Sequence, residues 1–285
     1  MNILITGTST GFGKLTALSL AGRGHRVFAT MRDPGGKNAK HAEALRAPNI
    51  DVLELDVTNE ASVDAAVSNA LASAGHLDAV VNNAGQARIG LTETITPGQL
   101  AALLDINVVG IQRVNRAVLP SMRARKSGLV ILVSSGLGRI VMPVVGLYAA
   151  TKAAVEAFGD IYRYDLKPTG VDVTVVQPGA YPTEFGSGPD TVGADQDRAL
   201  GYGSNATALP DFVAWAQSMK AAPNPANPQD VADGIVKLIE MAPGTRPARV
   251  SIDRTGAPFT AKLNDAHAEV QRQLLAAVGK PHLAD

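Results

Sequence analysis

The sequence contains no cysteine among its 285 residues. Disulfide bonds, thiolate nucleophiles and cysteine-ligated zinc are therefore excluded together. The five histidines are far apart and form no HExxH pair, so we expect no metal site built from neighbouring residues. Lys and Arg number 26 and Asp and Glu also number 26. This zero net charge creates no overall field that would attract nucleic acid, and we expect no nucleic-acid partner.

Long hydrophobic runs are also missing. The longest aliphatic run near the middle of the chain, Leu129–Val133, is far too short to cross a bilayer. The first residues lack the basic flank of a signal peptide and resemble a strand. We therefore expect a cytoplasmic protein without membrane insertion, and 46% hydrophobic residues are enough for a large core.

Short β-branched runs alternate with longer helical stretches. The predicted strands are apolar on both faces, as in a parallel sheet covered by helices: Ile3–Thr6, Arg26–Met31, Ile50–Leu55, Ala79–Asn82, Leu129–Ser134, Val171–Gln177 and Ala248–Asp253. The predicted helices between them are Gly13–Arg23, Asn59–Ala74, Gly98–Arg125, Leu147–Lys167 and Pro228–Met241. This order predicts an α/β, Rossmann-type, doubly wound fold with a mostly parallel seven-stranded sheet and helices on both faces.

The regular alternation is interrupted after Pro178. Residues 179–228 are rich in Gly, Pro, Asp and Asn and contain one predicted short helix, around Asp211–Ala221. Because open α/β sheets bind ligands beyond the carboxyl ends of their strands, we expect residues 184–225 to form a lid over a substrate. A disordered linker is the alternative, but the sheet pattern resumes beyond it. A last amphipathic helix is expected at Phe259–Val278, packed on the body or on a partner.

A glycine-rich loop follows the first predicted strand and opens the first helix. Gly7 allows a tight turn, Gly11 lets the backbone approach a pyrophosphate, and Gly13 permits close packing of helix on strand. The helix N-terminus then offers N–H donors to phosphate. We therefore expect residues 1–285 to form a single NAD(P)-binding domain. The predicted phosphate-binding residues are Gly7, Thr8, Ser9, Thr10, Gly11, Phe12 and Gly13.

The choice of dinucleotide is made at the end of the second strand. An acidic residue there would hold the ribose 2′-OH of NAD, whereas an arginine suits the 2′-phosphate of NADP. In this chain Met31 occupies the acidic position and Arg32 follows it. We therefore expect NADP(H) to be preferred, with NAD(H) also possible. The alternative is that Arg32 is a surface residue paired with Asp33.

Tyr148 and Lys152 lie four residues apart on a predicted helix, and so share one face. A tyrosine pKa is about 10, and a nearby ammonium together with a positive nicotinamide would favour the phenolate. Such a pair can exchange a proton with an alcohol or carbonyl oxygen. Two further motifs end predicted strands at the same edge of the sheet: Ser134-Ser135 and Asn82-Asn83-Ala84-Gly85.

These motifs and the glycine loop, at these spacings, resemble the short-chain dehydrogenase/reductase family. The resemblance runs from residue 2 to about Thr183 and resumes over the last strand. Ala29-Thr-Met-Arg32 and the glycine loop look like the branch that contains hydroxysteroid and retinol dehydrogenases. The resemblance implies an NADP(H)-dependent oxidoreductase that interconverts a ketone or aldehyde and an alcohol by hydride transfer. It also implies that the small-molecule substrate is apolar.

The resemblance also assigns roles to four residues. Tyr148 would be the general acid/base, and Lys152 would bind the nicotinamide ribose and lower the pKa of the tyrosine. Ser135, thirteen residues before Tyr148, would bind the substrate oxygen, rather than Ser134. Asn107 would hold a water molecule in the proton relay. For each of these residues alone, an ordinary helix cap or surface side chain is the alternative.

Further cofactor contacts follow from the same resemblance. Asp56 would meet the adenine amino group, with Val57 beside it; the alternative is that Asp56 caps the next helix through Thr58 or Asn59. Pro182 stiffens the loop around Thr183, which would approach the carboxamide. The remaining predicted contacts lie near the adenosine ribose and the nicotinamide: Asn83, Ala84, Gly85, Pro178 and Gly179.

The substrate pocket and the rival functions are less well defined by sequence. We expect Ser135, Leu137, Val144, Tyr181 and the insertion to line the pocket. A sugar-nucleotide epimerase or dehydratase would share the Tyr–Lys pair, but the glycine spacing and the Asn-Asn-Ala-Gly motif argue against it. A catalytically silent regulator that senses dinucleotides would be expected to lack at least one of the four catalytic residues, and none is missing.

Small and aliphatic residues recur along the 147–166 helix more often than one buried face requires: Ala149, Ala150, Ala153, Ala154, Ala157 and Ile161. The family resemblance adds that this helix commonly builds a dimer interface. We therefore expect a homodimer or homotetramer, and the alternative is a stripe that packs only within the chain.

Overall fold

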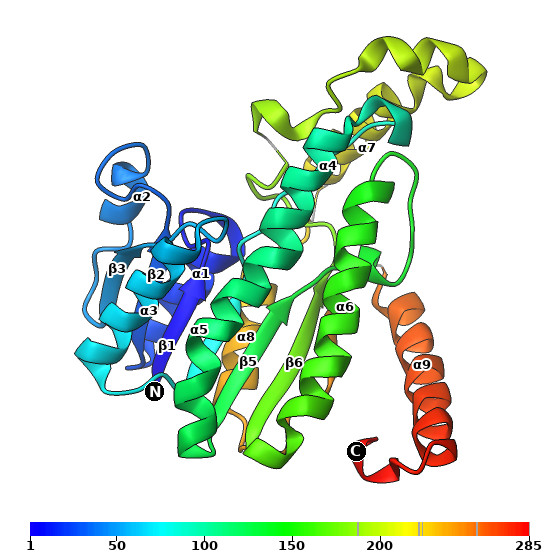
Figure 1. The fold of residues 1–285 in the computed structure, drawn as a ribbon. Helices are drawn as coiled ribbons and strands as arrows, with labels where there is room; N and C mark the ends of the chain where they lie inside the picture. The colour runs from blue at the N-terminus through cyan, green and yellow to red at the C-terminus, as the bar shows by residue number, and fades with distance from the viewer. Residues whose placement is uncertain (187, 222, 224, 255, 285) are drawn as a thin grey trace.

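The computed structural model describes residues 1–284 except 187, 222, 224 and 255. In this part of the chain a seven-stranded sheet lies at the centre, in the order β3-β2-β1-β4-β5-β6-β7, and every strand pair is parallel (Figure 1). The predicted doubly wound sheet is therefore confirmed. The strands are β1 (Asn2–Thr6), β2 (Arg26–Met31), β3 (Ile50–Glu54), β4 (Ala79–Asn82), β5 (Gly128–Val133), β6 (Val171–Pro178) and β7 (Arg249–Ile252).

Helices cover both faces of the sheet, as the two-sided apolar strands predict. They are α1 (Gly11–Gly22), α2 (Ala39–Glu43), α3 (Glu60–Ala74), α4 (Pro97–Leu104), α5 (Gly110–Arg125), α6 (Gly146–Leu166), α7 (Ala208–Lys220), α8 (Gln229–Glu240) and α9 (Ala257–Ala277). On one face Val63, Val114 and Val155 of α3, α5 and α6 pack into one core. On the other face Leu20 of α1 and Ile235 of α8 pack into a second core. The sheet order reverses between β1 and β4, so the carboxyl ends of these strands form the crevice where such folds bind ligands.

One predicted helix is interrupted. The stretch expected as a single helix over Gly98–Arg125 consists of α4, a π-helical turn at Asp105–Val109, and α5. A π turn accommodates an extra residue within a helix and often occurs at functional sites. Here Asn107 is fully buried and its amide is hydrogen-bonded on both sides, which holds the turn in place.

The 184–225 insertion lies above the carboxyl ends of the strands (Figure 1). The expected short helix is confirmed as α7, where Trp215 packs against Phe212 with ring centroids 5.5 Å apart. A short 3₁₀ turn at Pro189–Thr191 and a longer 3₁₀ stretch at Gln196–Thr207, kinked at Gly203, precede it and were not expected. Ile89 pairs with Val192 and so joins the insertion to the loop after β4. The insertion is thus built on the body rather than being a linker, although its residues 187, 222 and 224 lie outside the described part.

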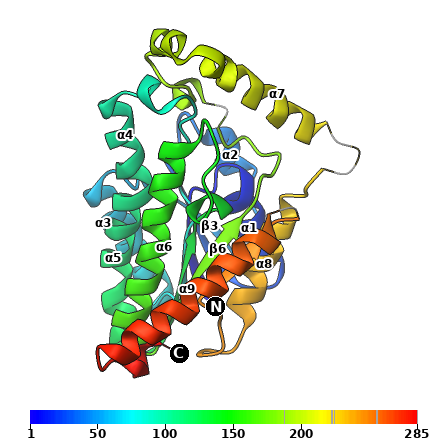
Figure 2. The same ribbon diagram turned by 90° about the vertical axis from the view of Figure 1, so that its right-hand side faces the viewer.

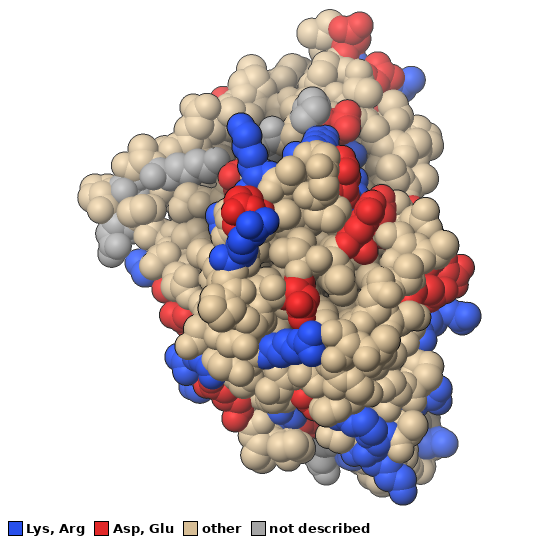
Figure 3. Space-filling model, turned by 90° about the vertical axis from the view of Figure 1, so that its left-hand side faces the viewer, with Lys and Arg blue, Asp and Glu red and all other residues tan. Residues whose placement is uncertain are grey.

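The C-terminal helix α9 runs beside the β7 edge of the sheet (Figure 2). Polar residues lie on the side of α9 that faces the protein, where Asn264 bonds to Gln177 of β6. Several apolar residues of α9 face outward, with Phe259 63% and Val270 64% exposed, while Leu275 is buried. Among the described residues no helix has the length and apolar character to span a membrane. The face in Figure 3 carries basic and acidic side chains mixed together, as the zero net charge leads one to expect.

Candidate active site

The glycine loop between β1 and α1 is folded tightly enough to require its glycines. Gly7 and Gly11 have φ values of 70° and 56°, in the region that favours glycine. A Cβ on Gly7 would lie 2.8 Å from the Cα of Ala84, and one on Gly13 would lie 2.3 Å from the Gly7 carbonyl oxygen. Thr10 is the N-cap of α1, and its side chain makes no capping bond. The first N–H groups of α1 therefore suit a pyrophosphate, and the loop fits a dinucleotide.

The end of β4 is tied directly to this loop. The Thr6 hydroxyl oxygen accepts hydrogen bonds from the backbone N–H groups of Asn83 and Ala84, both at 3.0 Å. The Asn83 side chain donates in turn to the carbonyl oxygens of Thr6 and Gly7, both at 2.9 Å. Asn83 and Ala84 thus hold the glycine loop in shape. Thr6 shares this role, which its position in a strand did not reveal.

The end of β2 leaves Arg32 exposed while Met31 is buried. The Asp33 carboxylate instead accepts a hydrogen bond from the backbone N–H of Lys37 at 2.7 Å. Within the described residues no ion pair joins Arg32 to Asp33, so the surface pairing considered above is not formed. The guanidinium is available to an anionic group.

Asp56 follows β3 and makes a local turn. Its Oδ1 accepts hydrogen bonds from the backbone N–H and the hydroxyl of Thr58, at 2.9 and 2.8 Å. The N-cap of α3 is Asn59, which accepts from the backbone N–H of Ser62. Asp56 is therefore not the helix cap. Val57 is buried against Gly110, where a Cβ would lie 2.9 Å from the Cβ of Val57.

Tyr148, Lys152 and Ser135 come together at the carboxyl edge of β5, all at most 8% exposed. The Lys152 Nζ lies 5.8 Å from the centroid of the Tyr148 ring and donates to the Val133 carbonyl oxygen at 2.8 Å. Ser135 is hydrogen-bonded to Tyr148, and its Oγ accepts from the backbone N–H of Leu137. Ser134 points away, toward the Lys152 carbonyl oxygen at 3.4 Å. The two serines therefore face different groups, and Ser135, the serine indicated by the family resemblance, is the one beside Tyr148.

Burial acts on both titrating groups of this pair. It raises the pKa of the Tyr148 phenol, and the hydrogen bond with Ser135 partly offsets that effect. It lowers the pKa of the Lys152 ammonium to about 8, against the opposing influence of the Glu156 carboxylate. At neutral pH Lys152, with a pKa of about 8, is therefore mainly the ammonium, and Tyr148 is the protonated acid.

Asn107 connects the π turn to this pair. Its Nδ2 donates to the Gln86 carbonyl oxygen and to the Thr151 hydroxyl oxygen, at 2.9 and 3.0 Å. The Thr151 hydroxyl in turn donates to the Tyr148 carbonyl oxygen. A Cβ on Gly85 would lie 3.3 Å from Asn107 Oδ1 and 3.7 Å from Lys152 Nζ. The four predicted catalytic side chains thus belong to one buried cluster.

The loop after β6 returns to the glycine loop. Pro178 ends β6, and the backbone N–H of Gly179 donates to the Ile252 carbonyl oxygen at 2.9 Å. A Cβ on Gly11 would lie 3.7 Å from the Cβ of Thr183. Thr183 therefore faces the proposed phosphate site across a narrow gap.

The predicted pocket residues have different roles. Leu137 is half-buried, and Val144 is buried with a φ of 71°, a strained value for a β-branched residue. The Tyr181 hydroxyl donates to the Ile252 carbonyl oxygen at 3.2 Å, and its ring packs edge-on against Phe12. Sequence reasoning did not single out Phe185, whose ring lies 5.6 Å from that of Tyr148 and is half-exposed. The one sequence feature that could have indicated Phe185 is its position as an aromatic residue near the start of the insertion.

In the described part of the chain no three His, Cys, Asp or Glu residues are placed to hold a metal ion.

Known proteins resemble both the sequence and the fold. Residues 1–189 match the family model described as short chain dehydrogenase. The chain is 37% identical over 183 residues to 3-ketodihydrosphingosine reductase of Bacteroides thetaiotaomicron, covering 64% of this chain and 65% of that protein. It is 31% identical over 264 residues to human retinol dehydrogenase 8, covering 86% and 78%.

A solved structure of a dehydrogenase also has a similar fold. The closed form of serine dehydrogenase complexed with NADP+ matches with a TM-score of 0.71 and 26% identity, covering 88% of this chain and 94% of that chain. The chain spans only 54 to 65% of the length of the first curated relatives that it matches. The matched region nevertheless contains the glycine loop, Asn107, Ser135, Tyr148 and Lys152. The chain belongs to the short-chain dehydrogenase/reductase family.

Proposed function

We propose that this protein is an NADP(H)-dependent oxidoreductase that interconverts a ketone or aldehyde and an alcohol. One observation carries the proposal: a buried Tyr148–Lys152 pair, in which Tyr148 is hydrogen-bonded to Ser135, lies beside a glycine cradle that fits a dinucleotide. A nicotinamide dinucleotide, when bound, exchanges the hydride with the substrate carbon.

The protein's own residues handle the proton. Tyr148 gives a proton to the carbonyl oxygen in reduction and removes it from the alcohol in oxidation. Ser135, already hydrogen-bonded to Tyr148, holds that oxygen in place. The Lys152 ammonium stabilises the phenolate, because a nearby positive charge favours the charged form of a tyrosine. Asn107 is proposed to hold a water molecule at the back of this relay.

The preference for NADP(H) rests on Arg32. It is exposed at the end of β2 and is not paired with Asp33, so it can meet a 2′-phosphate. Asp56, with one carboxylate oxygen in a local turn, is proposed to face the adenine, and Thr183 the carboxamide. The serine dehydrogenase named above was solved with NADP+. Binding of NAD(H) remains compatible with the same loop.

The substrate is proposed to be apolar beyond its reacting group, and the 184–225 insertion to be its lid. A cavity of about 410 Å³ lies between the insertion and the loop after β4, lined mainly by apolar side chains, among them Leu91, Leu209 and Val213, although none of the proposed catalytic residues lines it. Phe185 covers Tyr148 from the same insertion. Two relatives are named for ketodihydrosphingosine and retinol, which are largely apolar molecules.

The test is turnover of purified protein with a panel of carbonyl compounds, followed by the absorbance of NADPH. We expect oxidation of NADPH with at least one apolar ketone or aldehyde. A silent regulator would bind NADPH in a thermal-shift assay without turning over any of them. An epimerase or dehydratase would convert a nucleotide sugar without net change in NADPH. Either result would contradict the proposal.

The protein is also proposed to act in the cytoplasm as a homodimer or homotetramer. On α6 an apolar stripe of Ala150, Ala153, Ala157 and Ile161 is exposed. Light scattering at micromolar concentration should give at least twice the mass of the chain, and Ala157→Arg should lower that mass. A monomeric wild type would contradict the proposal and leave the stripe without a partner.

A further inference from the structure

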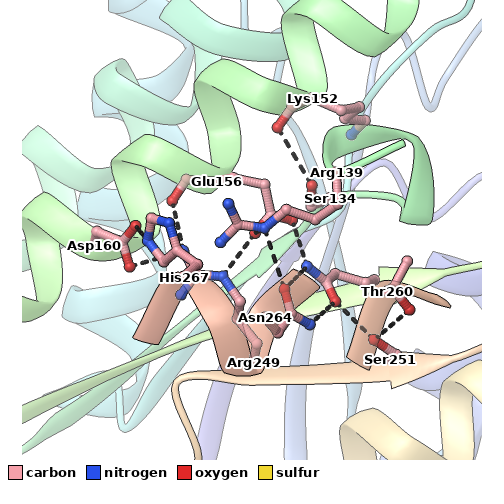
Figure 4. Close-up of polar contacts among 11 residues, drawn as sticks. Ser134, Arg139, Lys152, Glu156, Asp160, Arg249, Ser251, Thr260, Asn264 and His267 are labelled. Atoms are coloured by element: carbon pink, nitrogen blue, oxygen red, sulfur yellow. Dashed lines mark hydrogen bonds and ion pairs between the residues drawn. The ribbon is translucent and has the colours of Figure 1, made fainter. Parts of the chain in front are cut away.

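A second cluster of buried charged groups lies next to Lys152, centred on the following turns of α6 (Figure 4). Glu156 of α6 is one turn beyond Lys152 and 2% exposed. Its carboxylate accepts hydrogen bonds from Arg249 Nε at 2.8 Å and from Gln177 Nε2 at 3.1 Å, and Arg139 Nε lies 3.5 Å away. Burying a carboxylate is costly unless it is paired, and here β6, β7 and the loop after β5 all supply partners.

The same turn of α6 supports the loop that carries Ser135. A Cβ on Gly138 would lie 2.9 Å from Glu156 Cγ and 3.0 Å from the Lys152 carbonyl oxygen. The Ser134 hydroxyl donates to that carbonyl oxygen. Glu156 therefore packs where the serine loop meets the lysine turn, and a change at Glu156 is transmitted to both.

Helix α9 closes the cluster from outside. Asn264 accepts from Arg139 at 3.1 Å and exchanges hydrogen bonds with Gln177 at 2.7 and 3.2 Å. His267 lies 2.9 Å from Asp160, which also pairs with Arg249 at 2.7 Å. Asn264 and His267, on the side of α9 that faces the protein, thus complete this cluster.

Several neutral groups and one carboxylate face Lys152. The groups facing Lys152 are Tyr148 and Glu156 on α6, Ser135 and the Val133 carbonyl oxygen at the end of β5, and Asn107 across Gly85. Of these, the Glu156 carboxylate is the group that opposes the loss of the lysine's charge. The groups facing Glu156 are Arg139, Arg249, Gln177 and Lys152, with Asp160, Asn264 and His267 in the outer part of the cluster.

We propose that Glu156 is a positioning residue whose buried carboxylate keeps Lys152 an ammonium and holds its turn of α6 against the serine loop, with α9 closing the cluster. This role rests on the proposed function, in which the Lys152 ammonium assists Tyr148. Helix α9 touches none of the reacting groups. Through this cluster it would nevertheless support the Tyr148–Lys152 pair. Arg139 and Arg249 would then set how much of the Glu156 charge Lys152 experiences.

The direct test is a titration of Lys152 by NMR in the full chain carrying 13C-labelled lysine, with the signal assigned by its loss in Lys152→Arg. Removing the negative charge in Glu156→Gln disfavours the ammonium, so its midpoint should fall by about one pH unit below the wild-type value of about 8. Removing a positive charge in Arg139→Gln should move the midpoint upward. Asp160→Asn is the matched control, because it also removes a partner of Arg249 but lies two turns from Lys152; its midpoint should stay near that of the wild type.

An unchanged or raised midpoint in Glu156→Gln would overturn the inference. If that variant does not fold, Arg139→Gln decides, since an unchanged or lowered midpoint there would also overturn it. The pH profile of alcohol oxidation is a second readout: the rise in kcat should move to higher pH in Glu156→Gln. A shifted lysine midpoint without a shifted kcat profile would support the placement of Glu156 and count against the proposed role of Lys152, so the two failures are distinguishable.

Discussion

The sheet edge and the 184–225 insertion lie face to face but are built in opposite ways. Leu132, in β5, is fully buried, whereas Leu200, in the insertion, is 80% exposed. The proposed catalytic side chains lie at strand ends and on helix turns that adjoin two hydrophobic cores. The insertion consists of 3₁₀ segments and one helix, and it leaves Phe185, Tyr202, Val213 and Trp215 at least partly open to solvent. The difference places a well-packed sheet edge beside a more exposed insertion, and the proposed lid would bury this exposed apolar surface only when a substrate binds.

The largest effect on turnover is expected from removal of the proposed reacting atom, the hydroxyl oxygen of Tyr148. Tyr148→Phe removes only the titrating oxygen, so turnover should fall by about 10²–10⁴-fold while NADPH affinity stays near wild type. Tyr162→Phe on the same helix is the control, because its hydroxyl contacts Gln112 instead, and it should retain turnover. Retained turnover in Tyr148→Phe would mean that the acid/base lies elsewhere.

The second prediction compares the free energy of unfolding after truncation of a leucine in the sheet core and of a leucine in the insertion. Leu132→Ala leaves a cavity in the sheet core and should lower the free energy of unfolding by about 2–5 kcal/mol. Leu200→Ala makes the same truncation in the insertion, where it should change stability by no more than about 0.5 kcal/mol. Chemical denaturation measures both. Equal losses would show that the insertion is part of the cooperative core after all.

The third prediction concerns the cofactor preference, which is proposed to depend on Arg32 at the carboxyl end of β2. Two charge-assisted hydrogen bonds from Arg32 to a 2′-phosphate would favour NADPH over NADH by about tenfold to a hundredfold. Met31→Asp with Arg32→Ala should reverse the preference in kcat/KM, because a carboxylate repels the phosphate and can bind a ribose hydroxyl. Arg46→Ala, on an exposed arginine paired with Glu43, should leave it unchanged. Equal wild-type kcat/KM with NADH at matched ionic strength would refute the assignment of Arg32.

The smallest effect is expected from the insertion's aromatic contact with the site. Phe185→Ala removes an apolar surface beside Tyr148 and should raise KM for an apolar substrate by about tenfold, with little change in kcat. Phe259→Ala truncates an exposed phenylalanine of α9 and should leave KM alone. A loss confined to kcat in Phe185→Ala would instead make Phe185 part of the orientation of Tyr148.

The same contrast explains what could be predicted from the sequence. Strand ends are marked by a change from apolar runs to polar motifs, so Ser134-Ser135, Asn83 and the glycine loop could be located by position, and Tyr148 and Lys152 could be placed on one helix face by spacing. The choice of Ser135 over Ser134 came from the family resemblance. Glu156 carries no such mark, because its partners Arg139, Gln177 and Arg249 come from three separate segments. Tyr181 and Phe185 are four residues apart in an irregular loop, where no period predicts that Phe185 contacts Tyr148 while Tyr181 packs on Phe12.

Trp215 gives the insertion a built-in optical reporter. It is the only tryptophan in the chain, and it lies on α7, 40% exposed and beside Phe212. Emission excited selectively from tryptophan therefore comes from the insertion and from no part of the sheet. Because the chain also has no cysteine, a single engineered thiol on the body could carry an acceptor dye without competing sites. Energy transfer between the two would report whether the insertion moves relative to the body when a ligand binds, and would so test the proposed lid.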